Sequence, residues 1–584
     1  MTTLSGELTK IRIGDRTEEV DVLQHRLVTA GFLDGIGPVE HVEVEGDTRT
    51  LLAAGGQLDE ATSLAIAAYQ TFHHLDASGL IDESTLELLN RPRCGCPDRP
   101  DRFSLLSPSA QTSKWPSTRL SHRITNNTGD LNAGQVQAAI GDALQLWNDV
   151  SPFTFSRVTS GGDILLSFQT GNHGDGAANA FDGTGGVLAH AYGPGTSSLA
   201  GDVHFDDDET WSVVRPTPSG SRDLVHTAAH ELGHSLGLSH STMSNSMMYS
   251  FYTGIRVLNW EDRERIRALY GARATAPVQV PGWFGSQDQG GDIAIGNINR
   301  NGTPDLVVMH IDNPSGENHA YYRVGWNLNA SGNVTGGWTP PIQIPGWFGS
   351  QNQGGGVSIA DINGNGRPDL IVFHIDNPSG ENRGYYRIGW NLGTNGRVTG
   401  GWTAPIPVPG WFGSQNQGGS IAVGNVNGSG GADLVVFHLD NPSGENRGYY
   451  RVGWNLNSSG TVTGGWTNPT PIPGWFGSEN QGGGVALANV TGLGRTDLIV
   501  FHLDNPSGEN HGYYRVGRNL NSSGQIRNGW GSPILIDGWF GSQNQGGGIA
   551  TADLNRSGIA DLLVFHVDNP SGENHGYHRM VRDL

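Results

Sequence analysis

Cysteine is almost absent from this sequence: Cys94 and Cys96 are the only two among 584 residues, and one residue separates them. A framework of disulfide bonds therefore does not hold the chain together. No run of 18 consecutive apolar residues occurs, which excludes a transmembrane helix. The first 30 residues contain no basic stretch followed by an apolar run, so we expect no signal peptide in the sequence as it stands.

Basic residues are also scarce, with 35 lysines and arginines against 56 aspartates and glutamates and a net charge of −21. An acidic surface repels phosphate groups, so we expect neither nucleic acid nor a membrane surface as a partner. Glycine, in contrast, is abundant at 89 residues, and 16 Trp, 14 Tyr and 18 Phe accompany it. This composition predicts turn-rich β structure and not disorder.

A repeat dominates the C-terminal half. Five GWFGS segments, spaced by 64 residues, contain Trp283, Trp347, Trp411, Trp475 and Trp539. Each repeat has four short apolar stretches separated by turn residues, which is typical of a propeller blade. The fifth repeat lacks its last strand, and residues 276–280 (APVQV) match that strand. We therefore predict a five-bladed β-propeller over residues 273–584, closed by this N-terminal strand.

The rest of the chain predicts two further domains. Apolar positions at helical spacing indicate a small all-α domain over residues 1–98, followed by a Ser- and Pro-containing linker at 99–112. Residues 113–272 mix helical and strand patterns and predict an α+β domain. The whole chain is thus expected to be multidomain.

The motif HELGHSLGLSH contains His230, Glu231, His234 and His240. On a helix, His230 and His234 project from one face at the spacing that two imidazoles need to bind one Zn²⁺. Gly237 can then turn the chain and bring His240 round as a third ligand. Three protein ligands leave the fourth position for water, and Glu231 is placed to act as the catalytic base.

A short HExxH motif also arises by chance on surface helices. The extended motif followed by a methionine turn, SMMYS, is far more restrictive. With these residues, positions 10–272 resemble the matrixins, the matrix metalloproteinase branch of the zinc peptidases. The resemblance implies a zinc endopeptidase with Met248 beneath the metal.

The resemblance implies further sites. A structural zinc would be bound by His173, Asp175, His190 and His204. Calcium would be bound by Asp182, Asp206 and Glu209 with the carbonyls of Gly183, Gly185 and Val187, and a second calcium by Asp163 and Asp202. Substrate would pair with the strand edge 187–191, and the implied substrate-binding residues are Leu188, Ala189, His226 and Tyr252. A helix-face histidine without a binding role is an equally good interpretation of His226.

Residues 91–98, RPRCGCPD, are similar to the matrixin cysteine switch. In the latent form the Cys94 thiolate would fill the open zinc position, and Arg93 would pair with Asp98. Cys96 departs from the family pattern: it either competes for zinc or forms a disulfide with Cys94 on oxidation. The preceding helical domain resembles peptidoglycan-binding-like domains, and we expect it to be inhibitory.

Two features of the repeats suggest binding. The loop 361–369 resembles FG-GAP and VCBS-like calcium loops through Asp361, Asn363, Asn365 and Asp369, although Asx-rich turns alone give the same pattern. The segment HxDNPSGEN recurs five times. It indicates either polar contacts between blades or a surface that binds a glycan or matrix ligand.

These patterns favour a latent, calcium-stabilised zinc endopeptidase that cleaves a protein or peptide substrate and is docked by its propeller. One alternative is a carbohydrate- or protein-binding propeller with a non-catalytic protease-like scaffold, and another is a cell-wall endopeptidase. Calcium sites and the family resemblance favour an extracellular location.

Overall fold

A computed structural model describes residues 3–33, 35–36, 52–53, 55–98, 114–176, 179–285, 290–312, 318–346, 348, 354–377, 382–413, 418–440, 446–477, 482–505, 509–541, 546–569 and 573–584. The chain divides into two compact units, Met1–Leu269 and Tyr270–Leu584. Among the helices of the described part, none has both the length and the apolarity needed to cross a bilayer. The predicted linker 99–112 lies outside the described residues.

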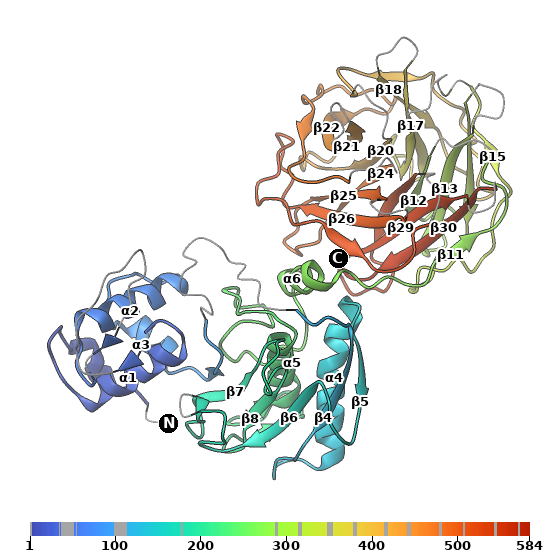
Figure 1. Cartoon of the computed structure of the whole chain (residues 1–584). Helices are drawn as coiled ribbons and strands as arrows, with labels where there is room; N and C mark the ends of the chain where they lie inside the picture. Colours follow the sequence, from blue (N-terminus) through green and yellow to red (C-terminus); the bar gives the residue numbers. More distant parts are fainter. Residues whose placement is uncertain are drawn as a thin grey trace. The chain divides into compact units, whose positions relative to one another are not determined.

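The N-terminal region is helical, as predicted (Figure 1). Its elements are the 3₁₀ helix η1 (Gly6–Lys10), α1 (Glu18–Thr29), β1 (Gly35–Ile36), β2 (Leu52–Ala53), α2 (Glu60–Phe72), α3 (Glu83–Leu89) and β3 (Arg93–Cys94). Side chains of Thr17, Asp59 and Asp82 cap the N-termini of the three α-helices by accepting backbone hydrogen bonds. The apolar faces of α1 and α2 form one buried core.

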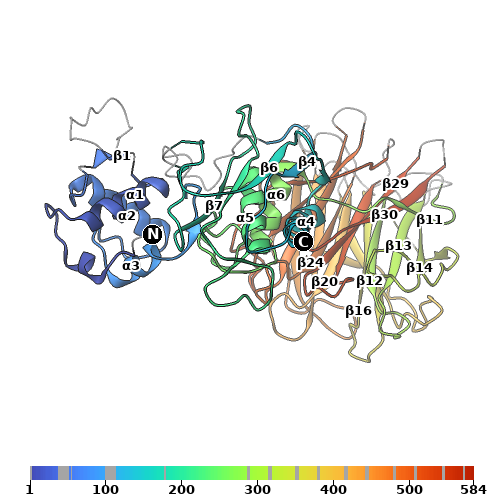
Figure 2. The ribbon, with the colours of Figure 1, turned by 90° about the horizontal axis from the view of Figure 1, so that it is seen from below.

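The second region of this unit is a mixed α/β domain. Its strands are β4 (Arg119–Ile124), β5 (Thr154–Arg157), β6 (Ile164–Gln169), β7 (Val187–Ala191), β8 (Val203–Asp206), β9 (Trp211–Ser212) and β10 (Arg222–Asp223), and its helices are α4 (Ala133–Val150), α5 (Leu224–Ser235) and α6 (Trp260–Tyr270). Helices α4 and α5 pack together (Figure 2). The Trp147 indole donates a 2.8 Å hydrogen bond to Ala229 O. Helix α5 also contacts β7 and β8, so the sheet supports the helix that carries the histidine motif.

The main sheet of this domain incorporates a strand from the N-terminal region. Its six strands run in the order β3-β7-β8-β6-β4-β5, so β3 forms one edge. Strand β3 pairs in parallel with β7, while β7 and β8 are antiparallel. The segment that contains Cys94 is therefore part of the catalytic-domain sheet.

The C-terminal unit is the predicted five-bladed propeller. The first blade comprises β12 (Gly291–Gly296), β13 (Asp305–Asp312), β14 (His319–Gly325) and β15 (Ile342–Gln343), and the second comprises β16 (Gly355–Ala360), β17 (Asp369–Asp376), β18 (Arg383–Gly389) and β19 (Ile406–Val408). The third comprises β20 (Gly419–Gly424), β21 (Ala432–Asp440), β22 (Arg447–Leu456) and β23 (Thr470–Pro471), and the fourth comprises β24 (Gly483–Ala488), β25 (Asp497–Asp504), β26 (His511–Gly517) and β27 (Ile534–Ile536). The fifth comprises β28 (Gly547–Ala552), β29 (Asp561–Asp568), β30 (His575–Val581) and β11 (Val278–Val280). The innermost strands of neighbouring blades contact one another around the ring, and β12, β20 and β24 lie near its centre in Figure 1.

The ring closes through its N-terminal strand, as the sequence predicts. Strand β11 pairs antiparallel with β30, and Val280 lies opposite Gly576. Val280 is fully buried, so its side chain is part of the core between the first and last blades. This pairing removes the free edge that the incomplete fifth repeat would otherwise expose.

We expect Val280→Asp to destabilise the propeller by at least about 3 kcal/mol, because an unpaired charge would be buried in the closing blade. Differential scanning calorimetry should show the propeller transition lowered by about 5 °C or more. Gln279→Asp, at the exposed neighbouring position, is the matched control and should melt like the wild type. Equal effects of both substitutions would argue against ring closure by β11.

Candidate metal centre

Helix α5 positions the first two histidines of the motif. It is capped by Asp223, whose carboxylate accepts hydrogen bonds from the backbone amides of Val225 and His226. His230 and His234 lie one turn apart on the helix, and both are buried. After the helix, Gly237 adopts a φ of +99°, and the chain turns to bring His240 back toward them.

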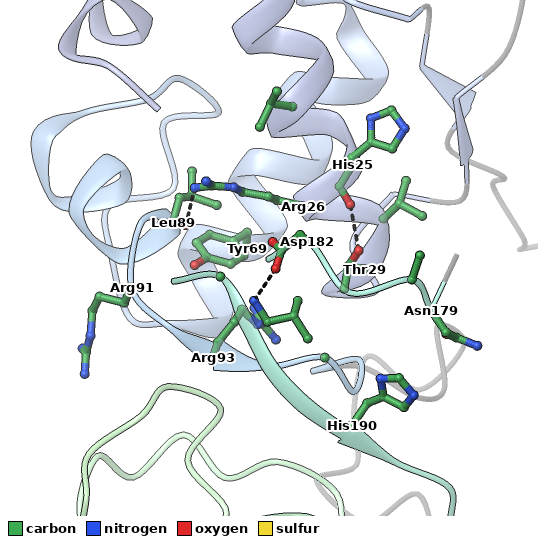
Figure 3. Close-up of a pocket in the computed structure, with 16 residues that line it drawn as sticks. His25, Arg26, Thr29, Tyr69, Leu89, Arg91, Arg93, Asn179, Asp182 and His190 are labelled. Carbon is green, nitrogen blue, oxygen red and sulfur yellow. Dashed lines mark hydrogen bonds between the residues drawn. The ribbon is translucent and has the colours of Figure 1, made fainter. Parts of the chain in front are cut away.

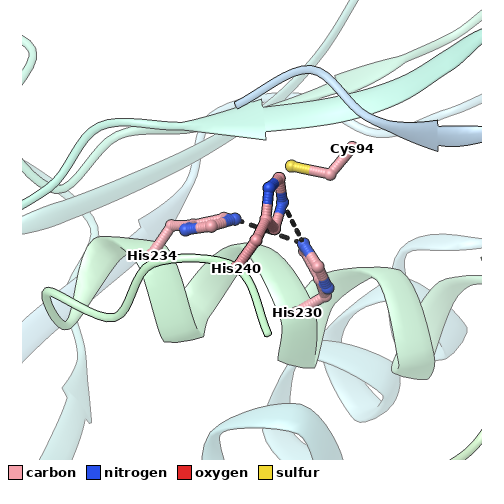
Figure 4. Close-up of side chains that lie close together, drawn as sticks. All are labelled: Cys94, His230, His234 and His240. Atoms are coloured by element: carbon pink, nitrogen blue, oxygen red, sulfur yellow. Dashed lines mark hydrogen bonds between the residues drawn. The ribbon is translucent and has the colours of Figure 1, made fainter. Parts of the chain in front are cut away.

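The three imidazoles converge through their Nε2 atoms (Figure 4). Nε2 of His230 lies 3.2 Å from Nε2 of His234 and 3.2 Å from Nε2 of His240. Tetrahedral coordination of zinc at about 2.1 Å places two nitrogens about 3.4 Å apart, so the observed spacing fits one shared zinc ion. The ring contacts expected from the sequence are therefore present in the fold.

The opposite ring nitrogens have their own partners, which fixes the tautomers. Nδ1 of His230 donates to Met247 O, and Nδ1 of His234 donates to Leu238 O, both at 2.7 Å. Nδ1 of His240 lies 2.8 Å from Asp98 Oδ1. Because each Nδ1 faces an acceptor, the Nε2 lone pairs point to the common centre and can bind a metal.

The methionine turn packs directly beneath the helix. Met248 is fully buried, and its side chain lies against Gly233, between the two helical histidines. A Cβ atom at position 233 would clash with the Met248 sulfur and lie 2.9 Å from the Trp147 ring. Glycine at this position therefore allows the turn to approach the helix closely.

Two thiols and one carboxylate surround the imidazoles. The ligand atoms of Cys94, His230, His234 and His240 all lie within 4.8 Å of one another, and a second such group consists of Cys94, Cys96, Glu231 and His234. Both cysteines are free and buried. Burial, followed by the effect of Cys96, raises the pKa of Glu231 to about 8. This pKa applies to the closed site, in which the Cys96 sulfur lies 4.0 Å from Glu231 Oε2.

Cys96 is fixed by the neighbouring sheet. Its Sγ donates to Ala191 O at 3.3 Å and accepts from Ala191 N at 3.4 Å. The same sulfur lies 4.0 Å from Glu231 Oε2, and the Cys96 amide donates to Cys94 Sγ at 3.2 Å. The sequence identified Cys96 as unusual but gave no signal for its contact with β7.

The segment around Cys94 lies between two backbone segments of the mixed α/β domain, one that contains β7 and one that contains Ser250. On one side Gly95 N donates to Ala189 O at 2.8 Å and Arg93 N donates to Gly186 O at 2.9 Å. On the other side Cys94 N donates to Ser250 O at 2.9 Å. The segment therefore covers the strand edge at which the sequence predicts substrate pairing.

Asp98 joins three distant parts of the chain. Its Oδ1 accepts a hydrogen bond from Arg93 at 2.9 Å, and its Oδ2 lies 3.3 Å from His73 Nε2. The same Oδ1 also contacts the third histidine, His240. The basic partners hold the pKa of Asp98 well below its usual range despite burial, which raises it. The pair with Arg93 was expected, whereas no sequence signal pointed to His73 or His240.

A second histidine cluster lies in the loop and strands next to the first. Asp175 Oδ2 lies 2.9 Å from His173 Nε2, 2.8 Å from His190 Nε2 and 3.2 Å from His204 Nδ1. The nitrogens of His173 and His190 lie 3.1 and 3.2 Å from that of His204. Four protein ligands at these separations fit a closed tetrahedral zinc site.

The acidic residues predicted to bind calcium gather around the loop before β7. Val187 N donates to Asp182 Oδ1 at 2.9 Å, and Gly185 N donates to Glu209 Oε1. Asp206 is fully buried, and its Oδ2 has no hydrogen-bond partner. Glu209 also lies 3.2 Å from Arg222 Nε. Gly183, in the same loop, has a φ of +78°.

At least one of the two residues predicted to bind a second calcium already has hydrogen-bond partners. Asp163 Oδ2 accepts hydrogen bonds from the amide and hydroxyl of Ser121 at 2.7 and 2.6 Å. Asp202 is buried, and burial raises its pKa. One carboxylate oxygen of Asp163 thus already accepts two hydrogen bonds from Ser121.

Three of the predicted substrate-binding residues share one small cavity. Leu188, His226 and Tyr252 line a space of about 10 Å³ together with Cys94, His230 and Glu231. His226 Nδ1 lies 2.8 Å from Ile255 O, and its ring packs edge-on against Tyr252 at 5.1 Å. Ala189 does not line this cavity, but its carbonyl binds Gly95.

A larger cleft separates the helical region from the catalytic domain. It has a volume of about 860 Å³ and is lined by residues that include His25, Arg26 and Thr29 of α1 and Asp182 before β7 (Figure 3). Helix α1 therefore does not pack tightly against this edge of the domain. Elsewhere the two regions pack closely, because Phe251 is part of the core of the helical region and its ring lies 5.2 Å from that of His73.

In the propeller, the predicted calcium loop of the second blade is a hydrogen-bonded turn. Asp361 accepts hydrogen bonds from the amides of Asn365 and Gly366, and Asn363 accepts one from Asn365. Asp369 accepts hydrogen bonds from Ile362 N at 3.0 Å and Asn391 N at 2.7 Å. These contacts give each carboxylate a structural role. Residues 313–317 of the first HxDNPSGEN segment lie outside the described residues.

The mixed α/β fold and the two zinc-type histidine clusters define a class of protein with two candidate metal centres. Comparison with known families gives three matches: Matrixin at residues 114–271, a peptidoglycan binding domain at 16–89 and an FG-GAP-like repeat at 297–372. Residues 114–271 therefore form a matrixin domain.

Individual proteins similar to this chain include Stromelysin-2 of Rattus norvegicus, 46% identical over 222 residues that cover 37% of this chain and 44% of the relative. Interstitial collagenase of Sus scrofa is 44% identical over 218 residues, covering 36% of this chain and 44% of the relative. Stromelysin-1 of Mus musculus is 43% identical over 218 residues, covering 36% and 43%. The chain thus spans less than half the length of these relatives.

The geometry predicts two zinc ions per chain, measurable by inductively coupled plasma mass spectrometry. His190→Ala should reduce the content to one, because it removes a ligand from the closed cluster and none from the site on α5. His25→Ala, which changes an exposed histidine of α1, is the matched control and should retain two. Two zinc ions in the His190→Ala variant would contradict the assignment of this cluster.

Proposed function

We propose that this chain is a latent zinc endopeptidase that hydrolyses peptide bonds in a protein or peptide substrate. The observation that carries the proposal is the convergence of three buried imidazoles beside a buried glutamate, with a cysteine thiol against the same centre. A zinc ion held by His230, His234 and His240 would polarise the scissile carbonyl and lower the pKa of water.

Glu231 is the proposed catalytic base. It would take a proton from the attacking water and then donate that proton to the leaving amine. The strand β7 would align the substrate through main-chain hydrogen bonds, as the Ala189 carbonyl does for Gly95. Leu188, His226 and Tyr252 would shape the adjoining side-chain pocket, which is small while the switch segment is bound.

Latency is proposed to come from the N-terminal region. The Cys94 thiolate would occupy the position that water needs, and β3 would occupy the substrate's edge of the sheet. Asp98 would strengthen this closed state because it links Arg93 and His73 of the N-terminal region to the metal ligand His240. Removing residues 1–98 would release both the thiol and the strand.

Calcium is proposed at the Asp182, Asp206 and Glu209 cluster. Burial, and then the carboxylates of Asp208, Asp182 and Glu209, raise the pKa of Asp206 to about 6. A bound Ca²⁺ would relieve this crowding of negative charge and complete its coordination with loop carbonyls. Asp163 and Asp202 are a weaker candidate pair because Ser121 already binds Asp163. For the loop 361–369, the hydrogen bonds favour a structural turn over a calcium site.

An extracellular location is proposed because the matrixin domain and the candidate calcium site suit an environment rich in calcium. The propeller would then dock the enzyme on its target. The alternative of a non-catalytic scaffold is disfavoured because all three imidazoles, the glutamate and the switch thiol are present together. A cell-wall substrate would be detected as release of muropeptides.

We expect Glu231→Ala in the chain lacking residues 1–98 to lower kcat/KM for a peptide substrate by about 10²- to 10⁴-fold. The variant should still bind zinc, because Glu231 is not one of its ligands. Asp142→Asn, which removes an exposed carboxylate from α4, is the control and should keep full activity. Peptidase activity that survives Glu231→Ala would refute the proposed mechanism.

We expect Cys94→Ala to give the full-length chain part of its peptidase activity without any cleavage, because no thiolate remains to fill the open position while β3 still occupies the edge of β7. Cys96→Ala is the matched variant and should remain latent. In the unsubstituted chain the Cys96 sulfur binds the backbone of Ala191 in β7, so its loss leaves the Cys94 thiolate at the open position. Activity is measured on a fluorogenic peptide, and gel electrophoresis checks that the chain stays intact. A latent Cys94→Ala chain would eliminate the switch.

A further inference from the structure

Four propeller blades present the same cluster of three aromatic rings. It combines a tryptophan of a GWFGS loop with a histidine and a tyrosine from the two middle strands of the blade. The clusters are Trp283/His310/Tyr321, Trp411/His438/Tyr449, Trp475/His502/Tyr513 and Trp539/His566/Tyr577. In the second blade, His374 stacks on Tyr385 in the same way.

The geometry of the clusters repeats closely. In the first blade the Trp283 ring lies 5.4 Å from the His310 ring and 5.2 Å from the Tyr321 ring, at interplanar angles of 75° and 89°. In the fourth blade the corresponding values are 5.2 and 5.1 Å, at 75° and 90°. The histidine and tyrosine are stacked on each other in every case.

The exposed ring of each cluster is the tryptophan. Trp283, Trp411 and Trp539 are each 44% exposed and Trp475 is 45% exposed, although tryptophan is usually well buried. The partner tyrosines are half-buried, and the histidines are buried. Four of the blades thus offer one aromatic surface to solvent at an equivalent place, and Trp347 of the second blade lies outside the described residues.

The loop that carries each tryptophan is held in place by buried groups. Arg323 donates hydrogen bonds to the carbonyls of Pro281 and Trp283, and Arg451 does the same for Pro409 and Trp411. The φ of +94° at Gly282 lets the loop pass the Arg323 side chain closely. These contacts position the exposed ring before any ligand binds, which lowers the entropy lost on binding.

Behind each exposed ring lies an imidazole with unused hydrogen-bonding capacity. Neither nitrogen of His310, His438, His502 or His566 has a hydrogen-bond partner, although these side chains are buried. Burial, and then the nearby arginine, lowers the pKa of each to about 3, so the imidazoles are neutral. A neutral imidazole offers one donor and one acceptor, the pairing that a hydroxyl group also offers.

We propose that these clusters are repeated binding sites for neutral sugar residues of a glycan. The apolar face of a pyranose ring would pack on the exposed tryptophan, whose ring the buried histidine and the half-buried tyrosine hold in place. An acidic glycan fits poorly because the chain carries a net charge of −21. A protein partner fits poorly because the exposed rings are separate, one per blade, and do not form one contiguous apolar patch.

Several such sites on one ring would bind a multivalent glycan by avidity. This inference extends the docking role proposed for the propeller and does not depend on peptidase activity. It is therefore tested with the full-length chain carrying Glu231→Ala, so that a failed test of catalysis and a failed test of sugar binding remain distinguishable.

The experiment measures binding of this chain to a glycan microarray that displays neutral, sialylated and sulfated glycans, with gelatin spotted as a protein probe. We expect saturable binding to a subset of neutral glycans. Trp411→Ala should weaken the apparent affinity about three- to tenfold. Replacement of all five GWFGS tryptophans by alanine should abolish binding, and five replacements by phenylalanine should retain part of it.

Leu493→Ala is the matched control, because Leu493 is a 64% exposed apolar residue of the propeller outside the clusters. It should bind like the parent chain, and calorimetry should show folded propellers in all variants. Binding to no glycan, only to charged glycans or only to gelatin would overturn the proposal. Unchanged neutral-glycan binding by the folded five-alanine variant would overturn it as well.

Discussion

The candidate active site depends on contacts to the Nδ1 atoms of three imidazoles, on the ring side opposite the shared centre. Two backbone carbonyls and one carboxylate face the Nδ1 atoms of His230, His234 and His240, and these contacts direct the Nε2 atoms to one centre. Two of the acceptors belong to the catalytic domain, whereas Asp98 comes from the segment that closes the site. The orientation of the third ligand is therefore coupled to latency through a single hydrogen-bonding group.

The closing segment uses the same backbone chemistry that a substrate would use. Strand β3 joins the sheet at β7, and its Cys94 amide also binds Ser250 across the cleft. One short segment therefore blocks two parts of the site at once: the edge of β7 and the centre formed by the three histidines. Backbone pairing, the contact of Cys96 with Ala191 and the contacts of Asp98 with Arg93 and His240 together fix the segment in this position.

Much of this organisation can be predicted from the sequence, because it is encoded in regular spacing. The GWFGS repeat defines five blades and the strand that closes them, and His230 and His234 define a metal-binding helix face. The sequence could not place Asp98 between His73 and His240, because these residues are brought together only by the tertiary fold. Nor could it decide the role of Asp361, since an oxygen-rich loop can bind either a cation or its own amides, and here it binds amides.

The way the propeller closes restricts where the chain can be divided. Because β11 both follows the catalytic domain and completes the last blade, the residues from Val278 onward belong structurally to the ring. Ala272 and Ala274 also form bridges to Ile536 and Val581 of the later blades. A proteolytic cut that frees a closed propeller must therefore fall before β11, and only a cut before Ala272 also keeps these two bridges; a cut after Val280 would leave β30 with an unpaired edge.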